Sequence, residues 1–219
     1  MMRLIPDAEH DDLHLGDRPL IVCDVDEVVL EFVTPFEAFL TDKGHELRPT
    51  SFRLHGNVFN RTDGNETPGE EVSRMLEAFF ESHDQWQTPV VEAADSLARL
   101  SEQADVVFLT AMPPRHREVR RRLLSRHGFD YPMIATEAPK GPAVLALHGD
   151  RPQPVAFIDD IFVNLQSVRS HVPQSLLVNL MANDTFRALA PHPGDGVDIA
   201  TDWAHAEALI NAHISARSD

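Results

Sequence analysis

The sequence predicts an α/β fold, a Rossmann-like three-layer sandwich with a mostly parallel sheet. Three observations carry this prediction: apolar runs of strand length, amphipathic helix patterns between them, and Gly and Pro residues at the borders. Continuous apolar runs are typical of strands whose two faces are both covered, as in a parallel sheet. The chain has 219 residues and is 42% hydrophobic, enough for one core and a small inserted unit.

Five segments have the pattern of buried strands. They are short and apolar, and they alternate with segments whose apolar residues recur every three or four positions. Because strands alternate with helices, we expect βαβ units that build a mostly parallel sheet. The expected strands are 20–25, 106–110, 132–136, 155–159 and 175–180, and the expected helices are 90–103, 113–127 and 203–215.

The segment 32–88 interrupts this alternation. It contains a helix-like piece at 35–42, then a stretch rich in Gly and Pro, and then a second helical pattern at 70–82. A segment of this length is too long for a plain loop. We therefore expect a small, mainly helical cap at 32–88, inserted after the first strand, and a core domain built from 1–31 and 89–219.

Charge and composition exclude several classes of function. The chain has 19 Lys and Arg against 35 Asp and Glu, a formal net charge of −16. An acidic surface repels nucleic-acid polymers and anionic lipid, so we expect neither as a partner. No segment approaches the roughly 20 apolar residues that cross a bilayer. The single cysteine excludes an internal disulfide, and with no signal-peptide pattern we expect a cytoplasmic protein.

Polar side chains follow the apolar runs where the expected strands end. In open α/β sheets, ligands bind at this edge. The residues concerned are Asp24 and Asp26 after the first run, Thr110 at the end of the second, Lys140 before a later helix, and Asp159 and Asp160 at the end of the fourth.

Such a set suits phosphoryl chemistry. Converging carboxylates repel one another unless a cation lies between them, and oxygen ligands of this kind favour Mg²⁺. Lys140 adds a positive charge, while Thr110 and the backbone N–H groups that follow it can bind phosphate oxygens. A carboxylate can attack phosphorus directly and form an aspartyl phosphate.

Four short motifs resemble those of the haloacid dehalogenase (HAD) superfamily. IVCDVDEVVL resembles the first motif, an apolar strand followed by two alternating aspartates. FLTAMP resembles the second, Lys140 in EAPKGPAV fits the third, and FIDDIFVN resembles the fourth. The motifs occur in the family order across residues 20–164, about two thirds of the chain.

The resemblance implies a role for each residue. Asp24 would attack the phosphate, and Asp26 would protonate the leaving group and then activate water. Thr110, Ala111 and Lys140 would hold the phosphoryl oxygens. We also expect Arg115, in the first turn of the following helix, to contact the substrate. The implied Mg²⁺ ligands are Asp24, the backbone carbonyl of Asp26, and Asp159 or Asp160.

Two details narrow the expected subclass. Asp26 is the second acid of the phosphatase branch, which the dehalogenase branch lacks. The stretch DVDEVVLEFVTPF is similar to small 5'(3')-deoxyribonucleotidases, although Glu27 stands where those enzymes commonly have Gly. The substitution leaves the phosphatase chemistry untouched.

The sequence thus predicts a Mg²⁺-dependent phosphatase that hydrolyses a small phosphorylated metabolite. Alternatives on the same chemistry are a 5'-nucleotidase-type enzyme and a phosphotransferase; a different class is a non-catalytic binding or signalling protein on the same fold. Chain order argues against a signalling receiver domain, in which the acidic pair comes first. The substrate and the oligomeric state are left open, and so is the role of the cap residues that could select the leaving group, namely Phe52, His55, Asn57, Phe59 and Trp86.

Overall fold

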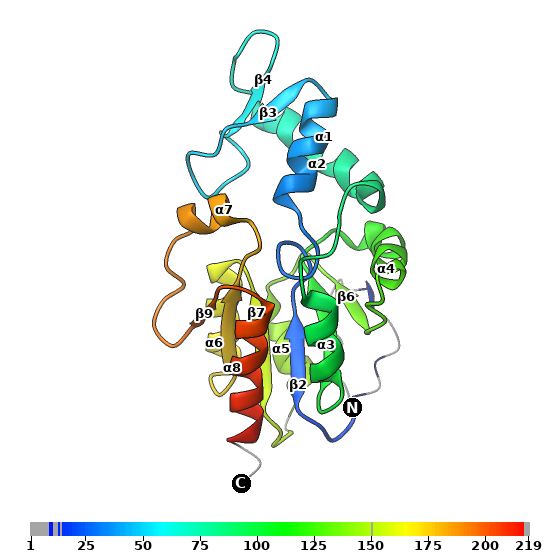
Figure 1. The fold of residues 1–219 in the computed structure, drawn as a ribbon, viewed down its shortest axis with the longest axis vertical. Helices are drawn as coiled ribbons and strands as arrows, with labels where there is room; N and C mark the ends of the chain where they lie inside the picture. The colour runs from blue at the N-terminus through cyan, green and yellow to red at the C-terminus, as the bar shows by residue number, and fades with distance from the viewer. Residues whose placement is uncertain (1–8, 11–12, 14, 150, 217–219) are drawn as a thin grey trace.

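A seven-stranded sheet with helices on both faces forms the centre of the computed structural model, which describes residues 9–10, 13, 15–149 and 151–216 (Figure 1). The strand order is β1-β6-β5-β2-β7-β8-β9; β1 is antiparallel to β6, and all other neighbours are parallel. The mostly parallel α/β fold is therefore confirmed. The strands are β1 (Glu9–His10), β2 (Leu20–Cys23), β5 (Asp105–Thr110), β6 (Met133–Ala135), β7 (Val155–Asp159), β8 (Leu176–Leu180) and β9 (Asp198–Ala200).

Alternate side chains of the central strand β2 point to opposite faces of the sheet, and each face is covered by its own layer of helices. Ile21 and Cys23 face one hydrophobic cluster, and Leu20 and Val22 face the other. Because both faces are covered, the strand has no polar position, which explains its continuous apolar run. The first cluster is covered by α3 (Ala93–Ser101), α4 (Arg117–Arg126) and α8 (Trp203–Ser215), and the second by α5 (Lys140–His148) and α6 (Phe162–His171).

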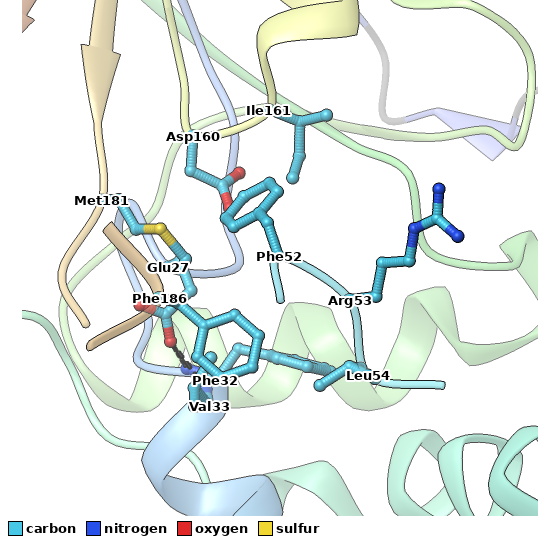
Figure 2. Close-up of a pocket in the computed structure, with 10 residues that line it drawn as sticks. All are labelled: Glu27, Phe32, Val33, Phe52, Arg53, Leu54, Asp160, Ile161, Met181 and Phe186. Atoms are coloured by element: carbon cyan, nitrogen blue, oxygen red, sulfur yellow. Dashed lines mark hydrogen bonds between the residues drawn. The ribbon is translucent and has the colours of Figure 1, made fainter. Parts of the chain in front are cut away.

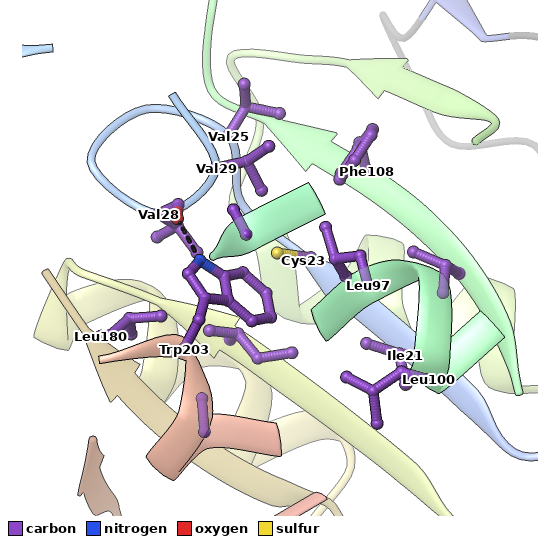
Figure 3. Close-up of a cluster of buried hydrophobic side chains, with 14 of the residues drawn as sticks. Ile21, Cys23, Val25, Val28, Val29, Leu97, Leu100, Phe108, Leu180 and Trp203 are labelled. Atoms are coloured by element: carbon purple, nitrogen blue, oxygen red, sulfur yellow. Dashed lines mark hydrogen bonds between the residues drawn. The ribbon is translucent and has the colours of Figure 1, made fainter. Parts of the chain in front are cut away.

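Trp203 closes the first cluster. Its ring lies among the aliphatic side chains of β2 and α3, as Figure 3 shows, and its indole Nε1 donates to the backbone oxygen of Val28 at 2.8 Å. The bond satisfies the one polar atom of a fully buried side chain. It also attaches α8 to the loop that follows β2.

All five predicted strands are found, but several short elements escaped prediction. The chain adds β1 and β9 at the two edges of the sheet and α7 (Asp184–Leu189) after β8. These elements have two, three and six residues, too few to show a period in the sequence. Residues 1–8, which the prediction assigned to the core domain, lie outside the described residues.

The 32–88 segment forms a separate group of elements beyond the carboxyl ends of the strands (Figure 1). Its helices pack through phenylalanine side chains, with Phe36, Phe39 and Phe79 within 6.2 Å of one another by ring centroids. A two-stranded antiparallel pair, which was not predicted, joins the helices. The elements are α1 (Val33–Asp42), β3 (His45–Leu47), β4 (Val58–Asn60), α2 (Gly69–Ser82) and the 3₁₀ turn η1 (His83–Gln85).

The segment leaves and rejoins the sheet at one place. The backbone N–H of Glu31 donates to Thr88 at 2.9 Å, and that of Val90 donates to Val29 at 2.9 Å. The two crossings are thus hydrogen-bonded side by side. No helix in the described part of the chain is long and apolar enough to cross a membrane.

Candidate active site

Three carboxylates meet at the carboxyl edge of the sheet. Asp24 follows β2, while Asp159 ends β7 and Asp160 comes directly after it. The two strands are parallel neighbours in register, with Cys23 opposite Ile158, so their ends coincide. Each carboxylate has an oxygen within 4.8 Å of the other two, and all three residues are buried. The predicted convergence of two strand tips is present.

Lys140 lies between two of these carboxylates. It is the first residue of α5, and its Nζ is 2.7 Å from Asp24 Oδ1 and 2.6 Å from Asp159 Oδ2. Burial lowers the pKa of Lys140, but the two carboxylates outweigh burial and raise the pKa above its usual value. The ammonium group is therefore held charged inside the site.

Asp159 and Asp160 have different surroundings. Asp159 Oδ2 accepts from Lys140, and its Oδ1 accepts from the backbone N–H of Ile161 at 2.8 Å and from Asn164 Nδ2 at 3.0 Å. Within the described residues, no donor is hydrogen-bonded to the Asp160 carboxylate. Burial raises the pKa of Asp160 well above its usual value, and the charges of Asp159 and Asp24 raise it further. Asp160 thus has both oxygens free for a ligand.

The cluster has more carboxyl groups than cationic groups. Burial raises the pKa of Asp24 to about 7; the Lys140 charge opposes this rise and the Asp159 charge adds to it. Three carboxylates against one ammonium leave a formal excess of two negative charges in a buried place. A divalent cation with a preference for oxygen ligands balances this excess, so the donor set fits Mg²⁺.

Thr110 lies on the other side of β2. It ends β5, its side chain is fully buried, and its Oγ1 has no hydrogen-bond partner among the described residues. A buried hydroxyl without a partner is uncommon, and a phosphoryl oxygen would satisfy it. Ala111, the next residue, is exposed. The phosphate-binding role expected of Thr110 and Ala111 stays a prediction.

Asp26 departs from the expected convergence. Its carboxylate accepts from Arg120 Nη1 at 2.8 Å and Nη2 at 3.1 Å, and from Gln87 Nε2 at 2.8 Å. Burial raises the pKa of Asp26, but the charge and hydrogen bonds of Arg120 more than offset this and lower it. The side chain turns away because Arg120 is fully buried and requires a counter-charge.

Arg120 and Gln87 are the site residues that sequence reasoning missed. Arg120 belongs to the basic run of α4, and an arginine in such a run commonly lies on a solvated face. Arg120, however, stands three and four positions before Leu123 and Leu124, which are buried in the core. That spacing puts the arginine on the buried face and could have identified it.

Arg115 contacts the 32–88 segment. Its Nε donates to Glu77 Oε1 at 2.9 Å, and His116 Nε2 lies 2.8 Å from the same oxygen. Glu77 belongs to α2, so the pair joins this helix to the core. The substrate contact expected of Arg115 stays a prediction.

Glu27 has a left-handed backbone, with φ of 62°. Glycine adopts this conformation without cost, which explains why it suits the position. Here the Glu27 carboxylate accepts backbone N–H bonds from Phe32 at 2.8 Å, Val33 at 2.6 Å and Asn183 at 2.7 Å. The three bonds offset the strain and tie the start of α1 to the core.

An apolar pocket adjoins the acidic cluster. Phe52, on the loop between β3 and β4, and Asp160 both line it (Figure 2). The other predicted cap residues have structural contacts: Arg48 lies over the Phe59 ring at 4.6 Å, and Trp86 packs on Phe39 at 5.5 Å. His55 lies 3.0 Å from Ser73 Oγ, and buried Asn57 binds the backbone of its own loop.

Solved structures of HAD proteins share this architecture. A haloacid dehalogenase-like hydrolase from Streptococcus pneumoniae is 14% identical with a TM-score of 0.56, covering 89% of this chain and 99% of its own. A predicted phosphoglycolate phosphatase from Haemophilus somnus is 14% identical with a TM-score of 0.55, covering 90% and 100%. L-2-haloacid dehalogenase from Xanthobacter autotrophicus is 14% identical with a TM-score of 0.55, covering 88% and 98%.

Sequence comparison alone does not reach this likeness. No protein-family model matches the chain, and no curated protein matches it. At identities of 14%, the similarity concerns the arrangement of elements along nearly the whole chain. The similarity to deoxyribonucleotidases stays a prediction. The chain has the haloacid dehalogenase-like fold, with the four motifs of its sequence at the carboxyl edge of the sheet.

Proposed function

We propose that the chain is a Mg²⁺-dependent phosphatase that hydrolyses a small phosphorylated metabolite through an aspartyl phosphate on Asp24. The observation that carries the proposal is the buried cluster of three carboxylates around Lys140, with the unpaired Thr110 hydroxyl on the neighbouring strand. This set combines a nucleophile, a cation site and phosphate-binding donors. Phosphoryl transfer requires little more of a protein than position and positive charge.

Asp24 and Asp160 are the side chains proposed to hold Mg²⁺, together with the backbone carbonyl of Asp26. Asp160 is preferred over Asp159 because the oxygens of Asp159 are hydrogen-bonded to Lys140, Ile161 and Asn164. When bound, the ion neutralises negative charge on the cluster and on the phosphate.

The proposed reaction has two steps. In the first, a carboxylate oxygen of Asp24 forms a bond to phosphorus while the bond from phosphorus to the leaving-group oxygen breaks. Asp26 gives its proton to that oxygen, and Thr110, Ala111 and Lys140 hold the phosphoryl oxygens. In the second, Asp26 accepts a proton from water, which attacks phosphorus and releases Asp24.

Asp26 can act as this acid only after its carboxylate leaves Arg120, because the ion pair stabilises the deprotonated form. The residues 32–88 are proposed to be a cap over the site. Gln87, at the end of this segment, also holds Asp26. The cap is therefore connected to the proposed acid.

Turnover of phosphate monoesters with Mg²⁺ tests the proposal. We expect Asp24→Asn to lower kcat by at least about 10³-fold, because the covalent route is lost. Asp130→Asn is the matched control: Asp130 is exposed and precedes β6, at the opposite edge of the sheet. Wild-type protein that hydrolyses no ester would refute the phosphatase activity. An Asp24→Asn variant as active as the control would refute Asp24 as the nucleophile.

A further inference from the structure

The pocket beside Asp160 has a volume of about 190 Å³ and lies between the core and the 32–88 segment (Figure 2). Asp160 lines the pocket, and an oxygen of Asp160 lies within 4.8 Å of an oxygen of Asp24. The pocket therefore adjoins the proposed nucleophile, Asp24, with the Asp160 carboxylate between them. Its lining residues are Glu27, Phe32, Val33, Phe52, Arg53, Leu54, Asp160, Ile161, Met181 and Phe186.

The walls offer carbon surfaces from both sides. Phe52 and Leu54 come from the loop between β3 and β4, and Met181 and Phe186 come from the core after β8. The rings of Phe52 and Phe186 lie 6.3 Å apart by centroid and both line the pocket. A ligand in this space exchanges water for apolar contact on both sides.

The charged lining residues leave few polar partners for a ligand. Both carboxylate oxygens of Glu27 are bound to backbone N–H groups. Arg53 is exposed, and in Figure 2 its guanidinium lies away from the phenylalanine rings, at the margin of the pocket. Among the described lining side chains, Asp160 offers free polar atoms at the end next to Asp24, and Arg53 offers its guanidinium at the margin. The pocket is therefore polar at the phosphate end and at the margin, and apolar between them.

We infer that this pocket receives the leaving group of the substrate, and that this group is compact and apolar, about the size of one ring. The inference rests on the proposed function. A dry cavity of roughly 150 Å³ lined by aliphatic and aromatic side chains can hold benzene, so 190 Å³ accommodates one ring and little more. A polar leaving group would lose hydrogen bonds to water along the apolar walls, where the described side chains between Asp160 and the marginal Arg53 offer it no partner.

A binding experiment tests the inference without turnover. Benzylphosphonate mimics a phosphate ester with a ring-sized leaving group, and 2-hydroxyethylphosphonate mimics one with a small polar group. With Mg²⁺ present, calorimetry should show that benzylphosphonate binds at least about tenfold more tightly, the gain expected for burying most of a ring. Equal affinity for the two phosphonates would overturn the inference.

Two variants locate the preference. Phe52→Ala removes one wall and should reduce the affinity ratio at least about threefold, and Leu54→Trp fills the pocket and should abolish the ratio. Tyr131→Ala is the control, since this half-buried aromatic precedes β6 at the far edge of the sheet. If Phe52→Ala and Tyr131→Ala keep the same ratio, the ring binds elsewhere and the inference is wrong.

Turnover separates this inference from the proposed function. Phenyl phosphate should be hydrolysed with a kcat/KM at least about tenfold above that of glycerol 3-phosphate, and the ratio should fall in Phe52→Ala. A Phe52-dependent preference for benzylphosphonate without hydrolysis of any ester would refute the proposed function and retain the pocket assignment. Hydrolysis of both esters at equal kcat/KM, dependent on Asp24, would retain the function and refute the assignment.

Discussion

Asp24 lies among like charges that only Lys140 partly offsets. Its pKa of about 7 in the folded protein exceeds the ordinary value of 3.8, chiefly through burial. Between these two pH values the folded state keeps a proton that the unfolded state has released. The free energy of unfolding therefore decreases as pH rises through this window, and the full cost is present above pH 7.

We predict that Asp24→Asn stabilises the metal-free protein at pH 8, by on the order of a few kcal/mol. The difference should shrink towards pH 4, where Asp24 is protonated in the folded state. Urea unfolding of both proteins in a chelator at the two pH values measures it. A stability difference independent of pH would show that ionised Asp24 does not destabilise the folded state. Asp130→Asn, the control, should change stability equally at both pH values.

Glu27 gives a second prediction at this scale. Glu27→Ala removes three hydrogen bonds while keeping the left-handed strain, and we expect a loss on the order of 3 kcal/mol. Glu27→Gly loses the same bonds but relieves the strain, so it should be about 1 kcal/mol more stable than the alanine variant. Chemical denaturation gives both values, and equal stability of the two variants would contradict the strain argument.

Single residues show how far the sequence could predict the site. Asp24, Asp159, Asp160 and Lys140 converge as expected, because each stands at the end of an element whose position the apolar pattern defines. The orientation of the Asp26 side chain was beyond prediction. It depends on Arg120, which comes from a helix that is distant in sequence and meets Asp26 only in the folded chain.

At the scale of elements, Asp26 and Arg120 join the loop after β2 to α4. Arg120 is fully buried, and the Asp26 side chain is 22% exposed. We predict a coupling energy of at least about 2 kcal/mol in a double-mutant cycle of Asp26→Asn and Arg120→Met, because either single variant leaves a poorly solvated charge.

The coupling should also depend on pH. The pKa of Asp26 is lowered below 3.8, so the stabilisation is complete above that value and is lost as pH falls through the folded-state pKa. Denaturant unfolding of the four proteins of the cycle at pH 7, and at the lowest pH that preserves folding, measures it. A coupling energy under about 0.5 kcal/mol at pH 7 would contradict the buried pair.

Helices and strands were predictable where their apolar residues form a continuous run or recur at a regular spacing. The strands 155–159 and 106–110 have both faces buried, so an unbroken apolar run marks them. The β3–β4 pair has three residues in each strand, and its buried Leu47 and Val58 belong to a cluster formed by the segment together with Met181 and Phe186. Its register depends on tertiary contacts between distant parts of the segment, which local pattern does not encode.

For the whole molecule, the proposed cation site predicts a stability that depends on Mg²⁺. A ligand that binds only the folded state at a hundred times its Kd stabilises by about 2.7 kcal/mol. We expect Mg²⁺ to raise the Tm of the wild type relative to a chelator. In Asp160→Asn, Mg²⁺ should no longer raise the Tm, because this variant removes the carboxylate proposed to bind the ion.

Asp26→Asn is the informative comparison for this experiment. Only the backbone carbonyl of Asp26 is proposed to bind the ion, so the variant should keep the rise in Tm. If Asp26→Asn abolishes the rise and Asp160→Asn keeps it, the proposed ligand set is wrong.

The paired crossings between the sheet and the 32–88 segment have a mechanical consequence. Both pass through one hydrogen-bonded neck, so a hinge motion there needs changes in only two adjacent stretches of backbone. The neck is attached to Glu27 through the N–H of Phe32 and to Asp26 through Gln87. A swing that carried Phe52 away from Asp160 would therefore strain the hydrogen bonds of both Glu27 and Asp26, and would link access to the cavity to the release of the proposed proton donor.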